Sequence, residues 1–207
     1  MNERSATRNL IPDAGRANEA SILNAALAAF AKDGFNGASM RDIARGAGTS
    51  LSNLYNYFAS KEQLLAEVLK ISNDAQLART QAAVSAAGPG AGERLQAAIV
   101  GFIGFVVEHP TASLVAISEI RYLGGSHRTQ VVTARDATQA IFVRIVEEGA
   151  RRGEFRTPHP ESAARAIVSM CSAISTWYHP EGPLTGQEVA LQYARYARGL
   201  VEATGLS

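Results

Sequence analysis

Cysteine is almost absent from this sequence of 207 residues, which holds Cys171 alone and therefore cannot form a disulfide within the chain. Also missing is any apolar run near the roughly 18 residues that a transmembrane helix needs. Residues 1–20, MNERSATRNLIPDAGRANEA, lack the apolar centre of a signal peptide. Together these absences predict a protein of the reducing cytoplasm that has no membrane among its partners.

A strong charge of either sign is lacking too, since 20 Lys and Arg balance 19 Asp and Glu to a net charge of +1. Residues 1–61 carry seven basic against five acidic side chains, and the remainder carries thirteen against fourteen. So weak an asymmetry does not by itself indicate nucleic-acid binding. Any contact with DNA must instead depend on individual cations such as Arg41, Arg45 and Lys61.

Motifs for catalysis and for cofactors are missing as well. The sequence contains no Walker A loop, no G-x-G-x-x-G after a strand and no H-E-x-x-H. His109, His127, His159 and His179 are isolated, and Cys171 lies within a helical pattern where a small core residue is expected. We therefore expect no catalytic residue, no metal site and no cofactor. An enzyme that uses Cys171 or a histidine remains the alternative from another functional class.

Apolar residues make up 46% of the chain and recur at helical spacing, with no strand-like alternation. Gly34 is expected to end the first helix, and Phe35 to pack back against it. The first helices should share a core of Leu27, Phe30, Ile43, Leu54 and Phe58. The pattern predicts an all-α protein of about nine helices, at 18–33, two within 39–58, and at 60–83, 93–108, 111–122, 127–153, 160–178 and 185–204.

Residues 39–58, SMRDIARGAGTSLSNLYNYF, favour two short helices joined by a tight turn. Ser39 is a good N-cap, with Asp42 three residues later, and Gly48 suits the left-handed conformation that ends a helix. Ser50 then caps a second helix, Leu51–Tyr57. Two helices joined by a short glycine-containing turn are typical of the helix-turn-helix motif, although a helical hairpin in any bundle would have the same spacing.

Residue identities strengthen this interpretation. IARGAG at 43–48 and LYNYFASKEQLL at 54–65 resemble the DNA-binding domain of the TetR family of bacterial regulators, over about residues 20–69. The sequence departs from the family at Leu51, where Lys or Arg is frequent, and at Tyr57, where His is frequent. These two departures bear on which operator sequence the protein recognises and not on its resemblance to the family.

The resemblance implies an N-terminal helix-turn-helix domain at 1–59 that binds operator DNA. Asn53 is the residue expected at a base edge, because its amide both donates and accepts hydrogen bonds. Lys61 is expected at a phosphate, with a solvated surface lysine as the alternative. Residues 1–18 could also touch DNA or be a disordered tail. The expected DNA-binding residues are Ser39, Arg41, Ser50, Leu51, Ser52, Asn53, Tyr55, Tyr57 and Lys61.

Residues 60–207 are expected to bind a small effector and to dimerise. WYHPEGPL at 177–184 is similar to the acyl-CoA-responsive subgroup of the family, which implies an apolar effector such as an acyl-CoA. The expected effector-binding residues are Phe102, Phe105, Arg121, Phe142 and Trp177. Alternatives are open for two of them: Trp177 in the dimer interface, and Arg121 in a surface ion pair, with Glu119 or Asp136 nearby.

The last two helices of each subunit form the dimer interface in the family, and the sequence is compatible with a homodimer of this kind. One expected face consists of Ala163, Ala166, Ile167, Met170, Ile174 and Trp177, and the other of Val189, Tyr193, Tyr196, Ala197, Leu200 and Val201. The resemblance thus predicts a repressor that its effector releases from DNA. A repressor that responds to a hydrophobic drug, or a DNA-binding protein without a ligand, is the alternative.

Overall fold

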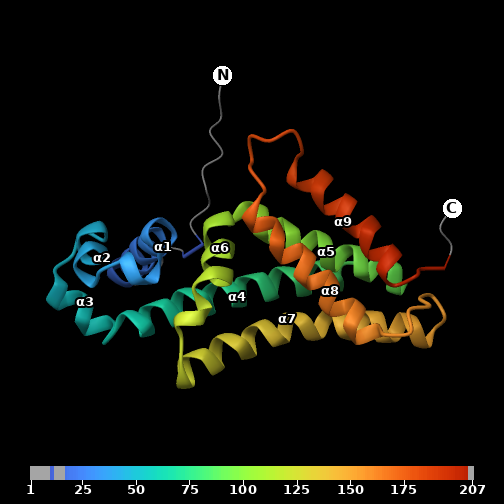
Figure 1. Ribbon diagram of the computed structural model, residues 1–207, viewed down its shortest axis with the longest axis horizontal. Coiled ribbons are helices and arrows are strands. Elements are labelled where there is room, and N and C mark those ends of the chain that lie inside the picture. The colour runs from blue at the N-terminus through green and yellow to red at the C-terminus, as the bar shows by residue number, and fades with distance from the viewer. Residues whose placement is uncertain (1–9, 12–16, 205–207) are drawn as a thin grey trace. The chain divides into compact units, whose positions relative to one another are not determined.

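The computed structural model describes residues 10–11 and 17–204 (Figure 1). In these ranges the chain forms nine α-helices and two 3-10 helices and no strand beyond an isolated bridge between Phe155 and Ala203, as the all-α prediction requires. The elements are α1 (Ala17–Gly37), α2 (Met40–Gly46), α3 (Leu51–Tyr57), α4 (Lys61–Ser85), α5 (Ala91–Glu108), α6 (Pro110–Ser118), η1 (Ile120–Tyr122), α7 (Gly125–Arg151), α8 (Pro160–Ala173), η2 (Ile174–Thr176) and α9 (Gly186–Leu200).

Two compact units share these helices. The first unit comprises the described parts of 1–75 together with 108–133, and the second comprises 76–107 together with the described part of 134–207. Helices α4 and α7 contribute to both units. The expected boundary at 59/60 stays a prediction, but the grouping adds a feature that the sequence did not show. The segment with α6 and η1 packs in the same unit as α1, α2 and α3.

The core of the first unit follows from the apolar stripe of α1. Ile22 and Ala26 are completely buried, and Phe30 is buried with them. They pack with buried residues of α2, α3 and α4, among them Ile43, Leu54 and Leu65. Of the expected core residues, Phe30, Ile43, Leu54 and Phe58 are buried and Leu27 is partly buried. This core fixes α2 and α3 against α1, so the short helices do not depend on their own helical propensity.

Gly34 interrupts α1 as the sequence predicts. Its backbone has φ 67° and ψ 172°, a conformation that residues other than glycine rarely adopt. Phe35 then turns into the core, where the centroid of its ring lies 5.9 Å from the centroid of the Phe30 ring. The two residues therefore end the regular part of the helix and direct the chain toward α2.

Three predicted helices are shorter than the sequence pattern indicates, and one of them, expected at 185–204, ends at Leu200. The helix expected at 111–122 ends at Ser118 and is followed by the 3-10 helix η1, and the buried carboxylate of Glu119 at this break accepts a hydrogen bond from the Phe35 backbone N–H at 2.7 Å. The helix expected at 160–178 ends at Ala173 and continues as the 3-10 helix η2. There the hydroxyls of Ser175 and Thr176 donate to backbone carbonyls three residues earlier, which competes with α-helical pairing.

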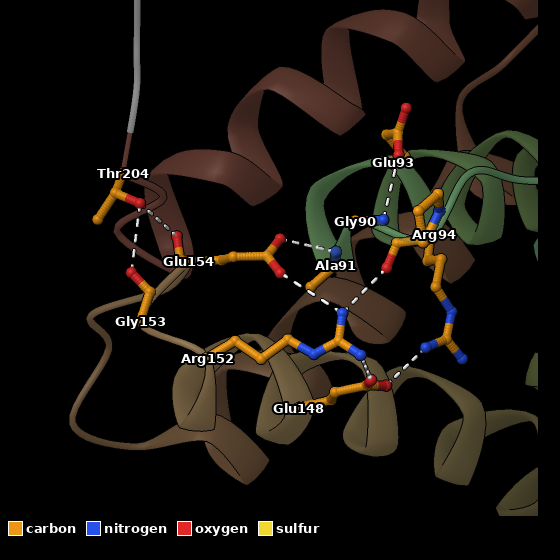
Figure 2. Close-up of polar contacts among 10 residues, drawn as sticks. Gly90, Ala91, Glu93, Arg94, Glu148, Arg152, Gly153, Glu154 and Thr204 are labelled. Carbon is orange, nitrogen blue, oxygen red and sulfur yellow. Dashed lines mark hydrogen bonds and ion pairs between the residues drawn. The ribbon is translucent and has the colours of Figure 1, made fainter.

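A polar network closes one end of the second unit (Figure 2). Glu148 of α7 accepts from Arg94 of α5 and Arg152, each at 2.5 Å. Glu154 accepts from the backbone N–H of Ala91 at the start of α5, at 2.7 Å. The arginines also hold the pKa of the Glu148 carboxyl below its ordinary value, chiefly through the hydrogen bond from Arg94. These contacts join the loop before α5 to the loop after α7.

No single helix in the described part of the chain is long and apolar enough to cross a membrane. Only α5 and α6 counted together, as a span broken at His109, meet the same criteria of length and composition.

Candidate DNA-binding surface and effector region

Helix α2 is capped by side chains within one turn. The Ser39 hydroxyl accepts from the Asp42 backbone N–H at 3.1 Å and donates to the Asp42 carboxylate at 2.5 Å. This hydrogen bond, together with the charge of Arg45, holds the pKa of the Asp42 carboxyl below its ordinary value. The cap predicted from the sequence is confirmed. The cap fixes the start of α2. Arg41, the second residue of this helix, is exposed.

The turn into α3 is equally well defined. Gly48 has φ 66°, and its N–H donates to the Arg45 carbonyl at 3.1 Å. The Thr49 N–H donates to the Ala44 carbonyl at 3.0 Å, so the last carbonyls of α2 are satisfied. Ser50 caps α3 by accepting from the Asn53 backbone N–H at 3.1 Å. The predicted helix-turn-helix geometry is therefore present, and Figure 1 shows the two short helices joined by this turn.

One face of α3 is turned toward solvent. Ser52, Tyr55 and Asn56 are exposed, and the Tyr55 side chain retains 48% of its accessible surface. Their spacing of three and four residues places them together on the helix surface. Leu51, Asn53 and Tyr57 are half-buried beside them. Asn56 is absent from the residues selected on the sequence, although its position one turn after Ser52 was the signal that could have identified it.

Asn53 already has a partner within the motif. Its side-chain amide N–H donates to the Thr49 hydroxyl at 2.8 Å. The amide oxygen remains as the atom that an exocyclic amino group of a base could meet. Contact of Asn53 with a base stays a prediction. In this conformation the amide oxygen and the second amide N–H are both available to a base, because Nδ2 carries two hydrogens and Thr49 takes one.

Lys61 has a role that neither sequence-based alternative described. Its ammonium donates to the carbonyls of Phe35 at 2.6 Å and Ala38 at 2.9 Å. It also lies 4.4 Å from the centroid of the Phe35 ring, within the range of a cation–π interaction. The turn between α1 and α2 leaves these carbonyls outside helical pairing, and the lysine satisfies them. Contact of Lys61 with a phosphate stays a prediction, but the lysine now has an internal partner.

The expected effector-binding residues differ in burial and in the unit to which they belong. Phe102 and Phe142 are buried in the second unit, where their rings meet edge to face at 6.0 Å. Phe105 is buried in the same unit. Arg121 is exposed in the first unit and stacks over its neighbour Tyr122 at 5.0 Å. The alternative that paired Arg121 with a surface Glu119 is wrong, because Glu119 is only 5% exposed and hydrogen-bonds to Phe35.

Trp177 lies at the surface of the second unit. It is 43% exposed and stacks on Tyr193 with ring centroids 6.4 Å apart. Leu191, Tyr196 and Leu200 of α9 are exposed as well, by 43 to 57%. This position favours the interface alternative for Trp177 over a wall around an effector.

Part of the expected dimer face is directed into the chain's own core. Six of its members are buried within the second unit: Ala163, Ile167, Ile174, Val189, Ala197 and Val201. Helical spacing identified the apolar stripes but not which stripe each helix buries. On α8 the exposed stripe instead consists of small residues, Ser162, Ala166, Ser169 and Ala173.

Some buried polar side-chain atoms in the described part of the chain have no hydrogen-bond partner. They include Asn73 Nδ2 on α4 and Ser113 Oγ on α6 in the first unit, and Gln139 Nε2 on α7 in the second. An unpaired buried donor costs about 1–3 kcal/mol, so a site that retains one is a candidate for binding a polar ligand atom or water. Sequence reasoning missed them, although Ser72 and Asn73 interrupt the apolar pattern of α4.

The described part of the chain contains no cluster of metal-binding side chains. Burial raises the pKa of the Cys171 thiol to about 12, which keeps it protonated and unreactive at neutral pH. Among residues 10–11 and 17–204 no group of three His, Cys, Asp or Glu side chains is arranged to hold a metal ion.

Comparison with known proteins agrees with this geometry. Residues 22–68 match the family model described as "Bacterial regulatory proteins, tetR family", and residues 88–201 match "Tetracyclin repressor-like, C-terminal domain". The HTH-type transcriptional repressor KstR2 of Mycobacterium tuberculosis is 31% identical over 188 residues, which are 89% of this chain and 93% of that protein.

Solved structures show the same fold. A tetR-family regulatory protein from Rhodococcus RHA1 is 27% identical with a TM-score of 0.85, over 91% of this chain and 98% of the other. AibR in complex with isovaleryl coenzyme A and operator DNA has a TM-score of 0.80 at 22% identity, over 90% and 99% of the two chains. The matched relatives are transcriptional regulators and not enzymes. The capped helix-turn-helix, the helical second unit and these matches agree: the chain belongs to the TetR family of bacterial transcriptional regulators.

Proposed function

We propose that this regulator is a cytoplasmic homodimeric repressor that binds operator DNA through α3 and leaves it when a small apolar effector, such as an acyl-CoA, binds. The observation that carries the proposal is the exposed face of Ser52, Tyr55 and Asn56 on α3, a helix capped at its start by Ser50. It is presented by a chain related over nearly its whole length to the repressor KstR2.

In the proposed complex α3 enters the major groove. Tyr55 and Ser52 meet phosphates or base edges, and the Asn53 amide oxygen accepts from a base amino group. Arg41 and the Ser39 hydroxyl lie at the start of α2, where the DNA backbone passes the first helix of the motif. Ser50 and Leu51 begin α3 and contact the groove edge, as does Tyr57. Since the chain has no strong net charge, affinity must come from such local contacts.

Dimerisation through α8 and α9 is supported by the exposed surface of the second unit. Small residues on α8 permit close approach of a second helix, while Trp177, Tyr196 and Leu200 supply large apolar and aromatic groups, with Trp177 joined to Tyr196 through the ring of Tyr193. Such a patch on a single chain indicates a partner surface. A two-fold pair would present two copies of α3 to half-sites about 34–36 Å apart or a multiple of that distance.

For the effector we propose a chemical class rather than a single compound. The solved KstR2 structure, 27% identical, is described as a ketosteroid transcriptional regulator, and the AibR fold accommodates isovaleryl coenzyme A together with operator DNA. Apolar contacts would come from Phe102, Phe105 and Phe142, with Arg121 as the candidate for a charged group of the ligand. Such a ligand shifts DNA binding only by its different affinity for the two conformations.

The test begins with selection of duplexes from a random-sequence pool by the full-length protein. Tyr55→Ala should weaken the selected duplex at least tenfold more than a scrambled duplex, whereas Gln130→Ala at an exposed position of α7 should not. A panel of acyl-CoAs, free acids and steroids is then titrated against the complex. Release by free hydrophobic compounds alone keeps the repressor and rejects the thioester, and failure of the whole panel favours a DNA-binding protein without a ligand. Failure to select any duplex rejects the function.

A further inference from the structure

The turn between α1 and α2 is held from a segment far away in the sequence. The Glu119 carboxylate, in the break between α6 and η1, accepts the Phe35 backbone N–H at 2.7 Å across 84 residues of sequence. Glu119 is only 5% exposed, so most of its side chain is removed from bulk water, and its carboxylate needs hydrogen-bond donors from the protein such as this N–H. A buried carboxylate that bonds to one backbone N–H places that peptide precisely in space.

A second residue of the same segment supports the turn. The Tyr122 ring stacks on Phe35 with centroids 5.2 Å apart and an interplanar angle of 20°. The Tyr122 hydroxyl also accepts from the Asn36 side-chain amide at 3.3 Å. From the other side, the Lys61 ammonium donates to the carbonyl of the same Phe35. The Phe35 residue is therefore bonded at its N–H to a carboxylate and at its carbonyl to an ammonium.

This turn leads directly into the DNA-binding motif. Three residues after Phe35 the chain reaches Ala38, and the next residue, Ser39, is the N-cap of α2. Helix α2 in turn is joined to α3 by the tight turn at Gly48. Because these connections are short, a displacement of Phe35 would move α2 and α3 together.

Glu119 and Tyr122 come from the part of the sequence that matches the C-terminal family domain, residues 88–201. By their contacts they belong to the same compact unit as the helix-turn-helix. We propose that Glu119 is a positioning residue for operator binding, which holds the turn between α1 and α2, and with it the recognition helix α3, through the Phe35 N–H. This inference depends on the proposed function, because its effect is measured as operator affinity.

Three substitutions separate the position of the acceptor from its charge. Glu119→Gln keeps an acceptor oxygen at the same reach and removes the charge. Glu119→Asp keeps the charge and withdraws the acceptor by one methylene group, and Glu119→Ala removes both. Glu147→Gln, an exposed carboxylate of α7, controls for the lost negative charge. That loss by itself would strengthen binding to DNA slightly, which is opposite to the expected effect.

The experiment measures the affinity of each full-length variant for the selected duplex and a scrambled duplex, beside thermal unfolding and hydrogen exchange of the Phe35 amide. We expect Glu119→Asp and Glu119→Ala to bind the selected duplex at least about tenfold more weakly, with the scrambled duplex unchanged and Phe35 exchange faster. Glu119→Gln should stay within about threefold of the wild type and of Glu147→Gln.

Specific affinity that is unchanged in Glu119→Asp, or a loss in Glu119→Gln that equals the loss in Glu119→Ala, would overturn the inference. Should Glu119→Ala not fold, the comparison of Glu119→Asp with Glu119→Gln decides alone. A loss shared equally by the selected and scrambled duplexes would also count against positioning. If the wild-type protein and Glu147→Gln select no duplex, the proposed function fails, whereas normal binding by all variants rejects this inference alone.

Discussion

Replacing Lys61 by methionine tests whether this residue holds the α1–α2 turn, contacts DNA, or does both. Methionine keeps much of the aliphatic length and removes the ammonium that donates to the Phe35 and Ala38 carbonyls. A hydrogen bond to a charged group contributes about 1.5–3 kcal/mol when buried, and a cation–π contact about 0.5–1 kcal/mol at an exposed site. Lys61 is half-buried and water can replace part of these contacts, so we expect a total loss of about 2 kcal/mol.

For a chain of this length such a loss lowers the melting temperature by roughly 4–8 °C. The matched control is Lys70→Met on the same helix, whose ammonium pairs only with Asp74 at the surface among the contacts described, at 2.7 Å. Its stability should change by less than about 0.5 kcal/mol, as is usual for exposed pairs. Denaturant unfolding of both variants compares the midpoints directly.

The DNA-binding role is measured separately, from the slope of log K against log salt on the selected duplex. If Lys61 also neutralises a phosphate, the slope becomes shallower by about 0.9 for each such contact removed. An unchanged slope with reduced stability assigns Lys61 to the turn alone. A variant that unfolds at the same denaturant concentration as Lys70→Met would refute the role of the lysine in holding the turn.

Three further outcomes are expected. Asn53→Ala should weaken operator binding by about 1–3 kcal/mol and relax the preference at one base pair, which affinity measurements on single-substituted duplexes would show; equal losses on every duplex would contradict base contact. The folded-state pKa values of Asp42 and Glu148 lie below their ordinary values of 3.8 and 4.5, so their stabilisation is complete above pH 4.5 and disappears as the pH falls through the lowered values. Acid unfolding of Glu148→Gln should therefore show a weaker pH dependence than that of the wild type, and an identical dependence would argue against the network. Tyr196→Asp should convert the proposed dimer to monomers in light-scattering measurements while helicity is retained; a dimer that persists at micromolar concentration would place the interface elsewhere.

The features that the sequence predicts well are those decided within one helical turn. Ser39 and Ser50 are each predicted as N-caps, and each accepts from the backbone N–H three residues later. A cap needs only a short polar side chain and its near neighbours, so the residues themselves contain the information. The same holds for Gly34 and Gly48, where glycine is the residue that the backbone conformation favours.

The choice of which apolar stripe is buried could not be made in this way. Helix α9 has one stripe with Val189 and Ala197 and another with Tyr196 and Leu200, and both have helical spacing. The first is completely buried in the core of its own unit, whereas the second is exposed. Periodicity gives the direction of an apolar face relative to its own helix, but the neighbours that cover it are set by tertiary packing.

Contacts across long separations were the least predictable, and they determine the candidate site. Glu119 and Lys61 are ordinary charged residues within helical patterns, and nothing in their local sequence connects them. Phe35 makes the connection, since its N–H and its carbonyl each need a partner once Gly34 has turned the chain out of the helix. Burying the Phe35 ring in the core places both polar groups away from water, so each must be satisfied from another segment. A carboxylate is the strongest acceptor for the N–H and an ammonium the strongest donor for the carbonyl, which gives both charges a physical reason to meet at one residue.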